Sequence, residues 1–137
     1  MKLDHDCIRA VLLYLERELR CCADTDGSIR FDSLSLSQIS DAVSKFSRED
    51  VFYSLFNLDQ SGYISASFLW LGNGIGECSV SYLTFAGHQY LEQIRDDRRW
   101  AFIKKGLAAV GNCSLSVIGT IAEGISAGAV SAYLESL

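Results

Sequence analysis

Residues 83–100 read LTFAGHQYLEQIRDDRRW, and this stretch says more about the fold than any other part of the chain. The Thr84 hydroxyl can accept a hydrogen bond from the first turn of a helix, so the pattern predicts a helix that starts there. Leu91 and Ile94 would share one helix face with Gly87, whose missing side chain lets a neighbouring element approach closely. We therefore expect the stretch to pack the scaffold together.

The same residues, 83–100, resemble the signature of a known protein family. The signature is LTxxGHxFLxxIRDDxxW, and it belongs to small bacterial and prophage proteins of unknown function that are described as winged helices. The resemblance covers mainly residues 1–105. It implies a winged-helix fold and an origin in a prophage or another mobile element, and it implies no particular activity.

Hydrophobic periodicity in the first part of the chain predicts two helices and a short strand. Apolar residues at helical spacing predict an amphipathic helix over 4–20. Polar and apolar residues alternate over 28–31, which predicts a small strand. Leu36, Ile39 and Val43 then mark a short second helix.

A third helix is expected over 47–61. Ser47 has the side chain of an N-cap, and Phe46 can pack against Val51 across that cap. Gly62 follows the last apolar residue, as glycine does at many helix ends. This helix occupies the place of a recognition helix in the winged-helix order.

A hairpin is expected next, because two strand-like segments flank a turn. Segments 63–71 and 78–83 are rich in apolar and aromatic residues, and the turn 71–76 contains three glycines. This hairpin would be the wing. The predicted fold class is therefore α+β and mostly helical, a winged helix-turn-helix with a β-hairpin wing.

Two further helices are expected after Thr84. The first is long, runs through the charge cluster at 95–99 and bends near Asp96 and Asp97, where its apolar stripe changes phase. The chain then divides into a winged-helix domain, 1–105, and a helical extension, 106–137, within the same compact unit. The extension carries a seam predicted to form a homodimer interface, made of Leu115, Ile118, Ala122, Ile125 and Ala129.

Composition fits a single folded domain in a reducing compartment. The 137 residues are 49% hydrophobic and 21% charged, which suits a protein with a real core. The five cysteines are odd in number and form no CxxC pair, and the charged N-terminus does not read as a signal peptide. We expect reduced thiols and a cytoplasmic protein.

The net charge of −5 argues against strong nonspecific attraction to phosphate. Residues 1–62 hold seven Lys or Arg against eleven Asp or Glu, whereas residues 63–111 hold five against four. Any basic surface must therefore come mostly from Arg95, Arg98, Arg99, Lys104 and Lys105.

Our first interpretation is a DNA-binding regulator of a prophage or mobile element, with duplex DNA as its partner. The exposed face of the third helix would present Asn57 and Gln60, whose amides can read adenine edges. Glu49 and Asp50 at the start of that helix oppose the approach of phosphate. The predicted nucleic-acid contacts are Arg48, Tyr53, Asn57, Gln60, Asn73, Arg95, Arg98 and Arg99.

The alternative is a protein-binding module that does not bind DNA. Its acidic surface would dock on a host factor, such as a defence nuclease, and modulate or inhibit that factor. Salt-dependent binding to duplex DNA separates the two interpretations.

Two segments look like metal-binding loops but lack the ligands. Residues 57–64 resemble the opening of an EF-hand, with a weaker copy at 24–29. Position twelve of the two loops falls on Phe68 and Ser33 in place of the bidentate Glu. Since the cysteines and histidines also lack zinc-knuckle spacing, we expect no metal and no cofactor.

Catalysis and membrane insertion are not expected either. His88 is two turns from Asp96 and Asp97, so no nucleophile, base and orienting group can be assembled, and no small-molecule substrate is evident. Segment 115–134 is only weakly apolar and carries Glu123 near its centre. Close helix packing explains its small residues better than a membrane span does.

Overall fold

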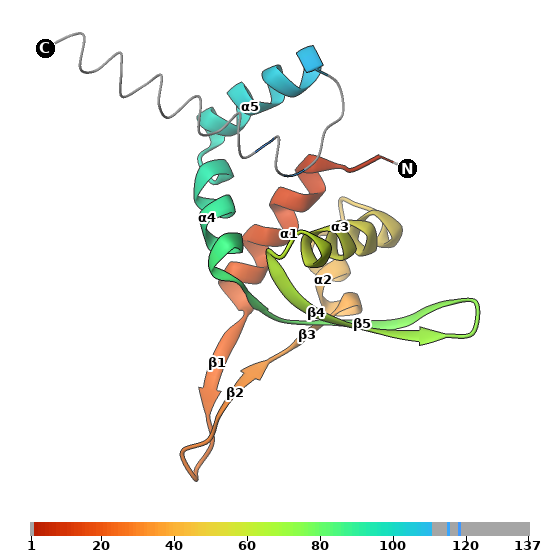
Figure 1. Cartoon of the computed structure of the whole chain (residues 1–137), viewed down its shortest axis with the longest axis vertical. Helices are drawn as coiled ribbons and strands as arrows, with labels where there is room; N and C mark the ends of the chain where they lie inside the picture. The colour runs from red at the N-terminus through yellow and green to blue at the C-terminus, as the bar shows by residue number, and fades with distance from the viewer. Residues whose placement is uncertain (1, 111–114, 116–117, 119–137) are drawn as a thin grey trace, which may run out of the picture.

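The computed structural model describes residues 2–110 together with Leu115 and Ile118 (Figure 1). In chain order the elements are α1 (His5–Glu18), β1 (Arg20–Ala23), β2 (Ile29–Asp32), β3 (Leu34–Ser35), α2 (Leu36–Ala42), α3 (Arg48–Gln60), β4 (Ile64–Leu71), β5 (Gly74–Leu83), α4 (Phe85–Ile94) and α5 (Asp97–Val110). The described part is thus α+β and mostly helical, as predicted.

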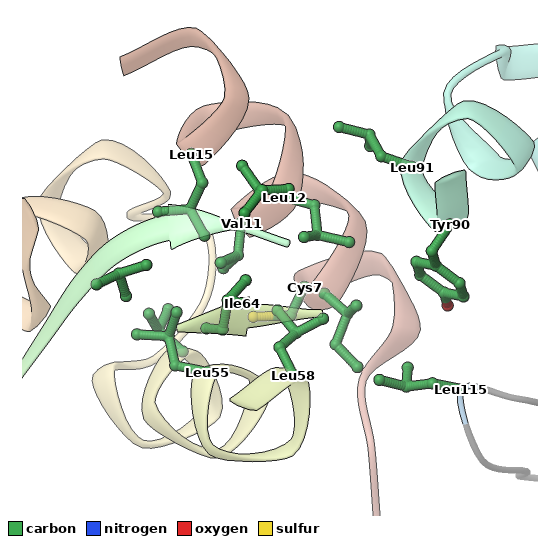
Figure 2. Packing of buried hydrophobic residues seen from close by; sticks show 14 of the residues in the cluster. Cys7, Val11, Leu12, Leu15, Leu55, Leu58, Ile64, Tyr90, Leu91 and Leu115 are labelled. Carbon is green, nitrogen blue, oxygen red and sulfur yellow. The ribbon is translucent and has the colours of Figure 1, made fainter. Parts of the chain in front are cut away.

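Helix α1 lies at the centre of the fold and contacts α2, α3 and α4. Asp4 caps it by accepting a hydrogen bond from the Cys7 backbone N–H at 3.1 Å. Figure 2 shows Val11 of α1 on the side of the helix that faces Leu55 and Leu58 of α3. All five buried α1 side chains join one core, and they are Cys7, Ile8, Val11, Leu12 and Leu15.

The strands form two antiparallel sheets. In the larger sheet β5 lies between β3 and β4, with Leu34 opposite Val80 and Ile64 opposite Leu83. The turn between β4 and β5 is shorter than expected, because β5 already starts at Gly74. The resulting β4–β5 hairpin projects from the helical body (Figure 1).

The smaller sheet, a β1–β2 hairpin, was not expected as a pair. The sequence predicted a strand near β2 but none at 20–23, where Cys21 pairs with Phe31. Most residues of both strands are exposed, so burial imposed no alternating pattern that could have marked β1.

The predicted helix caps are confirmed at two starts. The Ser47 hydroxyl accepts from the Asp50 N–H at 3.1 Å, and the Thr84 hydroxyl accepts from the Gly87 N–H at 3.0 Å. A third cap was missed, since Ser35 and Gln38 form a reciprocal capping box at the start of α2. The spacing of Ser and Gln three apart was the signal for it.

The expected bend near Asp96 is a full break between two helices. Helix α4 ends at Ile94, and α5 starts at Asp97. The Asp96 carboxylate accepts from the Arg99 N–H at 2.9 Å, so it satisfies a free backbone donor of the new helix.

The first two positions of the predicted dimer seam are buried within the single chain. Leu115 is 3% exposed and Ile118 is 0% exposed within a single chain, where both belong to the hydrophobic core. In this arrangement both side chains stabilise their own chain. The rest of the seam, Ala122, Ile125 and Ala129, lies outside the described residues.

Candidate functional site

The largest hollow along α3 lies between that helix and the β4–β5 hairpin. It is a cavity of about 750 Å³, open to solvent. We call it the aromatic groove, because Phe52, Tyr53, Phe56 and Trp70 line it. Its other lining residues are Lys2, Leu36, Arg48, Glu49, Asp50, Gly74 and Gly76.

The groove follows from how α3 divides its apolar residues. Val51, Leu55 and Leu58 point inward and are fully buried. Phe52 and Phe56 lie to one side of that buried face, and both rings pack edge-on against Phe68 of β4, with centroids 5.9 Å and 5.8 Å apart. The aromatic contacts thus hold the hairpin on α3 and form the apolar wall of the groove.

The outer part of the hairpin leaves three large apolar side chains in solvent. Leu69 is 54% exposed, Trp70 is 64% exposed and Leu71 is 59% exposed. They are consecutive, and a register shift in β4–β5 pairing falls between Leu69 and Trp70. Of these three, Trp70 lines the aromatic groove. Large apolar side chains left in solvent beside such a groove are a feature of interaction sites.

One end of the groove carries charge. Glu49 and Asp50 lie in the first turn of α3, where the helix dipole favours negative groups, and neither makes an ion pair within residues 2–110. Arg48 donates to the Ser37 hydroxyl at 3.1 Å, so α2 holds its guanidinium. Lys2 is the other cation of the lining.

The residues predicted to read DNA from α3 differ in their surroundings. Tyr53 lines the aromatic groove. Asn57 turns its amide back onto its own helix and donates to the Tyr53 carbonyl at 2.8 Å. Gln60 is exposed at the helix end, and Asn73 is exposed in the hairpin turn.

The predicted arginines lie elsewhere. Arg95 binds the Glu16 carboxylate through both terminal nitrogens and also bonds Glu92 at 2.7 Å. These hydrogen bonds raise the pKa of Arg95 and lower the pKa of Glu16. Arg98 is exposed and Arg99 half-buried at the start of α5, which lies at a different end of the molecule from the hairpin tip (Figure 1). The structure therefore places the start of α5 away from the wing-like hairpin tip and engages Arg95 in a pair with Glu16.

The stretch 83–100 acts as scaffold, as the sequence predicted. Arg9 of α1 donates to the Ile94 and Arg95 carbonyls and pairs with Asp97 at 2.7 Å, so it holds the α4–α5 junction. Trp100 is 6% exposed and donates its indole N–H to the Asp6 carboxylate at 2.9 Å.

A small cavity of about 210 Å³ lies at the base of the β1–β2 hairpin. Cys21, His88 and Glu16 are among its lining residues, a neighbourhood that the sequence did not predict. Because Arg95 occupies the Glu16 carboxylate, that group is engaged in a structural pair. No group of three or more potential metal ligands lies together among the described residues.

Sequence reasoning missed the aromatic groove itself. Two signals were present: Phe52 and Phe56 fall outside the inward stripe of α3, and Phe68, Leu69, Trp70 and Leu71 run together without alternation. A strand with one covered face should alternate, and this run does not. Such a run fits a strand buried on both faces as well as an exposed one, so the pattern alone left the groove open.

The helices and the relatives of this chain bear on where and how it could act. Within the described residues, no helix has both the length and the apolar character to cross a membrane. A family model described as "Hypothetical protein (DUF2513)" matches residues 2–112. No curated protein and no solved structure matches significantly.

Proposed function

Because the chain belongs to the DUF2513 family of hypothetical proteins, we propose its function from its own surface: it is a winged-helix module that binds another protein through the aromatic groove. The element order supports the winged-helix assignment, with β3, α2, α3 and a β4–β5 hairpin in sequence and β5 central in the sheet. In this assignment α3 is the recognition helix and the hairpin is the wing.

The observation that carries the proposal is the apolar, open character of the groove. The surface between recognition helix and wing presents Phe52, Tyr53, Phe56 and Trp70 to solvent. Aromatic residues in a pocket are the anchors that supply most of the binding energy at protein interfaces. A cavity of about 750 Å³ accommodates several side chains of a partner segment.

Electrostatics favour a protein partner over duplex DNA. A recognition helix that enters the major groove brings its first turn close to phosphates, and here that turn carries Glu49 and Asp50. Asn57 donates an amide hydrogen bond to the Tyr53 carbonyl of its own helix. Arg95, the first residue of the basic cluster, is neutralised by Glu16. Affinity for DNA rests mainly on cations that face phosphate, and the groove supplies only Lys2 and Arg48.

The rest of the proposal follows from a docking role. We add to it three expectations from the sequence: the module acts without catalysis, it acts in the cytoplasm, and its partner is a protein of the host cell. Binding by an exposed groove would modulate that partner by occupying its surface.

The proposal is tested with a peptide display library. Wild-type protein selects binders, and their affinities are then measured for Trp70→Ser and Phe102→Ser. Phe102 is the matched control, because it is an aromatic residue exposed to a similar degree, 61% against 64%, and lies on α5 outside the groove. Neither substitution removes a buried side chain, so both variants should fold.

Selected peptides should bind Phe102→Ser as tightly as wild type and Trp70→Ser at least about tenfold more weakly, as expected for loss of an aromatic anchor. Equal binding to both variants would move the site away from the groove. Retention of wild-type protein on duplex DNA at about 50 mM salt, lost at about 200 mM, would restore the DNA-binding interpretation.

A further inference from the structure

A second cavity adjoins the aromatic groove at the start of α1. Its volume is about 470 Å³, and Leu3, Trp100 and Leu107 give it an apolar part. Asp6 lies in its wall, where it accepts from Trp100 and pairs with Lys104 at 3.1 Å. This cavity is therefore bounded by α1, α5 and the N-terminal segment.

The two cavities adjoin, and we refer to them together as the channel. Lys2 and Asp50 line both of them, so the aromatic groove ends where the second cavity begins. The channel runs from Trp70 on the hairpin, along the first turns of α3, to Leu107 on α5.

The middle of this channel is acidic. Asp4, Glu49 and Asp50 lie there, and none of the three makes an ion pair in the part of the chain that the structure describes. Lys2 and Arg48 face the same region, and Arg48 is held by Ser37. Lys104 pairs with Asp6, so three carboxylates without an ion pair, one of which caps α1, stand against Lys2 and Arg48.

We propose that the channel binds an elongated segment of a partner protein in which apolar residues flank a central Lys or Arg. The apolar residues at one end fill the aromatic groove, and those at the other end cover Leu3 and Leu107. The central cation lies over Asp50, whose carboxylate is shared by both cavities. This inference rests on the proposed function and specifies the partner that it requires.

Charge complementarity decides the sign of that central residue. An acidic partner residue would meet like charge from Asp4, Glu49 and Asp50, and a neutral one would leave their carboxylates facing apolar surface. Charge at the rim contributes selectivity, while the aromatic anchors contribute most of the affinity.

The test uses twelve-residue peptides selected by the wild-type protein. Each peptide is compared with a copy in which its central Lys or Arg is replaced by Gln, against wild type, Asp50→Asn and Asp41→Asn. Asp41 is the matched control, because it is an exposed carboxylate on α2 outside both cavities. Shortened peptides that cover only the aromatic groove complete the set.

The basic peptide should lose about threefold to fivefold in affinity on Asp50→Asn, the size of a partly exposed ion pair, and nothing on Asp41→Asn. The Gln peptide should bind wild type and Asp50→Asn equally. Peptides cut to half their length should bind about tenfold more weakly or worse, because they lose buried apolar side chains.

Two outcomes would overturn this inference while leaving the proposed function intact. Either the selected peptides carry no central cation and ignore Asp50→Asn, or half-length peptides keep full affinity. Failure to select any peptide whose binding depends on Trp70 would instead remove the proposed function, and this inference with it.

Discussion

Gly87 packs directly against the backbone of Tyr63. A Cβ atom placed on Gly87 would lie 2.0 Å from the Tyr63 carbonyl oxygen, far inside contact distance. The same oxygen accepts a hydrogen bond from the Thr84 N–H at 3.1 Å, and the Tyr63 ring stacks on Tyr90 with centroids 4.8 Å apart. Helix α4 therefore meets the start of β4 with no room for a side chain.

Gly87→Ala should destabilise the protein by about 3 kcal/mol, because backbone on both sides must move to admit one methyl group. Urea unfolding measures the change. Gly74→Ala is the control: a Cβ atom added there would have nothing within 4 Å, so its change should stay within about 0.5 kcal/mol. Equal stability of the two variants would contradict the close approach.

Trp100→Ala should destabilise the protein by roughly 3–5 kcal/mol, since a buried large aromatic is removed from the core. Trp100→Phe should destabilise the protein less, because the phenyl ring keeps most of the apolar contact. The loss that remains reflects mainly the missing hydrogen bond to Asp6. Thermal or urea unfolding distinguishes the two. An unchanged melting temperature for Trp100→Ala would show that the indole contributes no packing.

The Glu16–Arg95 pair predicts a loss of stability in acid. Hydrogen bonds from Arg95 lower the Glu16 pKa below its ordinary value of 4.5, against a smaller opposing effect of burial. Because the pKa of Glu16 is lower in the folded state, the pair contributes its full stabilisation above pH 4.5. That stabilisation is lost as pH falls through the lowered pKa.

Glu16→Gln should therefore be less stable than wild type at pH 7, by at most about 1 kcal/mol for a partly exposed pair. The difference should narrow as pH falls below 4.5. Glu92→Gln serves as control, because it leaves Arg95 paired with Glu16 and should change stability less. If the free energies of unfolding of wild type and Glu16→Gln changed in parallel with pH, the Glu16–Arg95 pair would not be the cause of the acid sensitivity.

Ile118→Ala should destabilise the monomeric fold by about 2–5 kcal/mol, because the side chain is fully buried in its own chain. Light scattering should give the same mass for variant and wild type. A change of mass with unchanged unfolding free energy would place Ile118 between two copies instead.

Cys21 should be alkylated by iodoacetamide at about pH 8 before Cys7 or Cys78. Burial raises the pKa of the Cys7 and Cys78 thiols to about 11, which suppresses the reactive thiolate, and it also blocks access. Cys21 is exposed on β1. Peptide mass mapping over time gives the order, and early labelling of Cys7 or Cys78 would contradict the packing described for them.

Local patterns predicted the elements best where a short segment determines its own structure. Ser47 and Thr84 mark helix starts through hydrogen bonds that span three residues, so no distant contact is needed. Strand β1 was missed because its exposed residues carry no alternation. The break at Asp96 was predicted as a bend. The apolar stripe changes phase there, which shows that the buried face changes direction but not whether the helix continues through the change.

The sequence by itself determined the starts of α3 and α4, the inward face of α1 and the packing role of residues 83–100, because periodicity and caps act within a few residues. Only the tertiary structure decided how surfaces combine. It paired Arg95 with Glu16, which lies 79 positions away in the sequence, and it placed Trp70 beside α3. Whether an arginine is free or neutralised depends on such distant neighbours, and so does whether exposed aromatics line a groove. For this reason the sequence suggested a DNA-reading face, and the fold presents an apolar one.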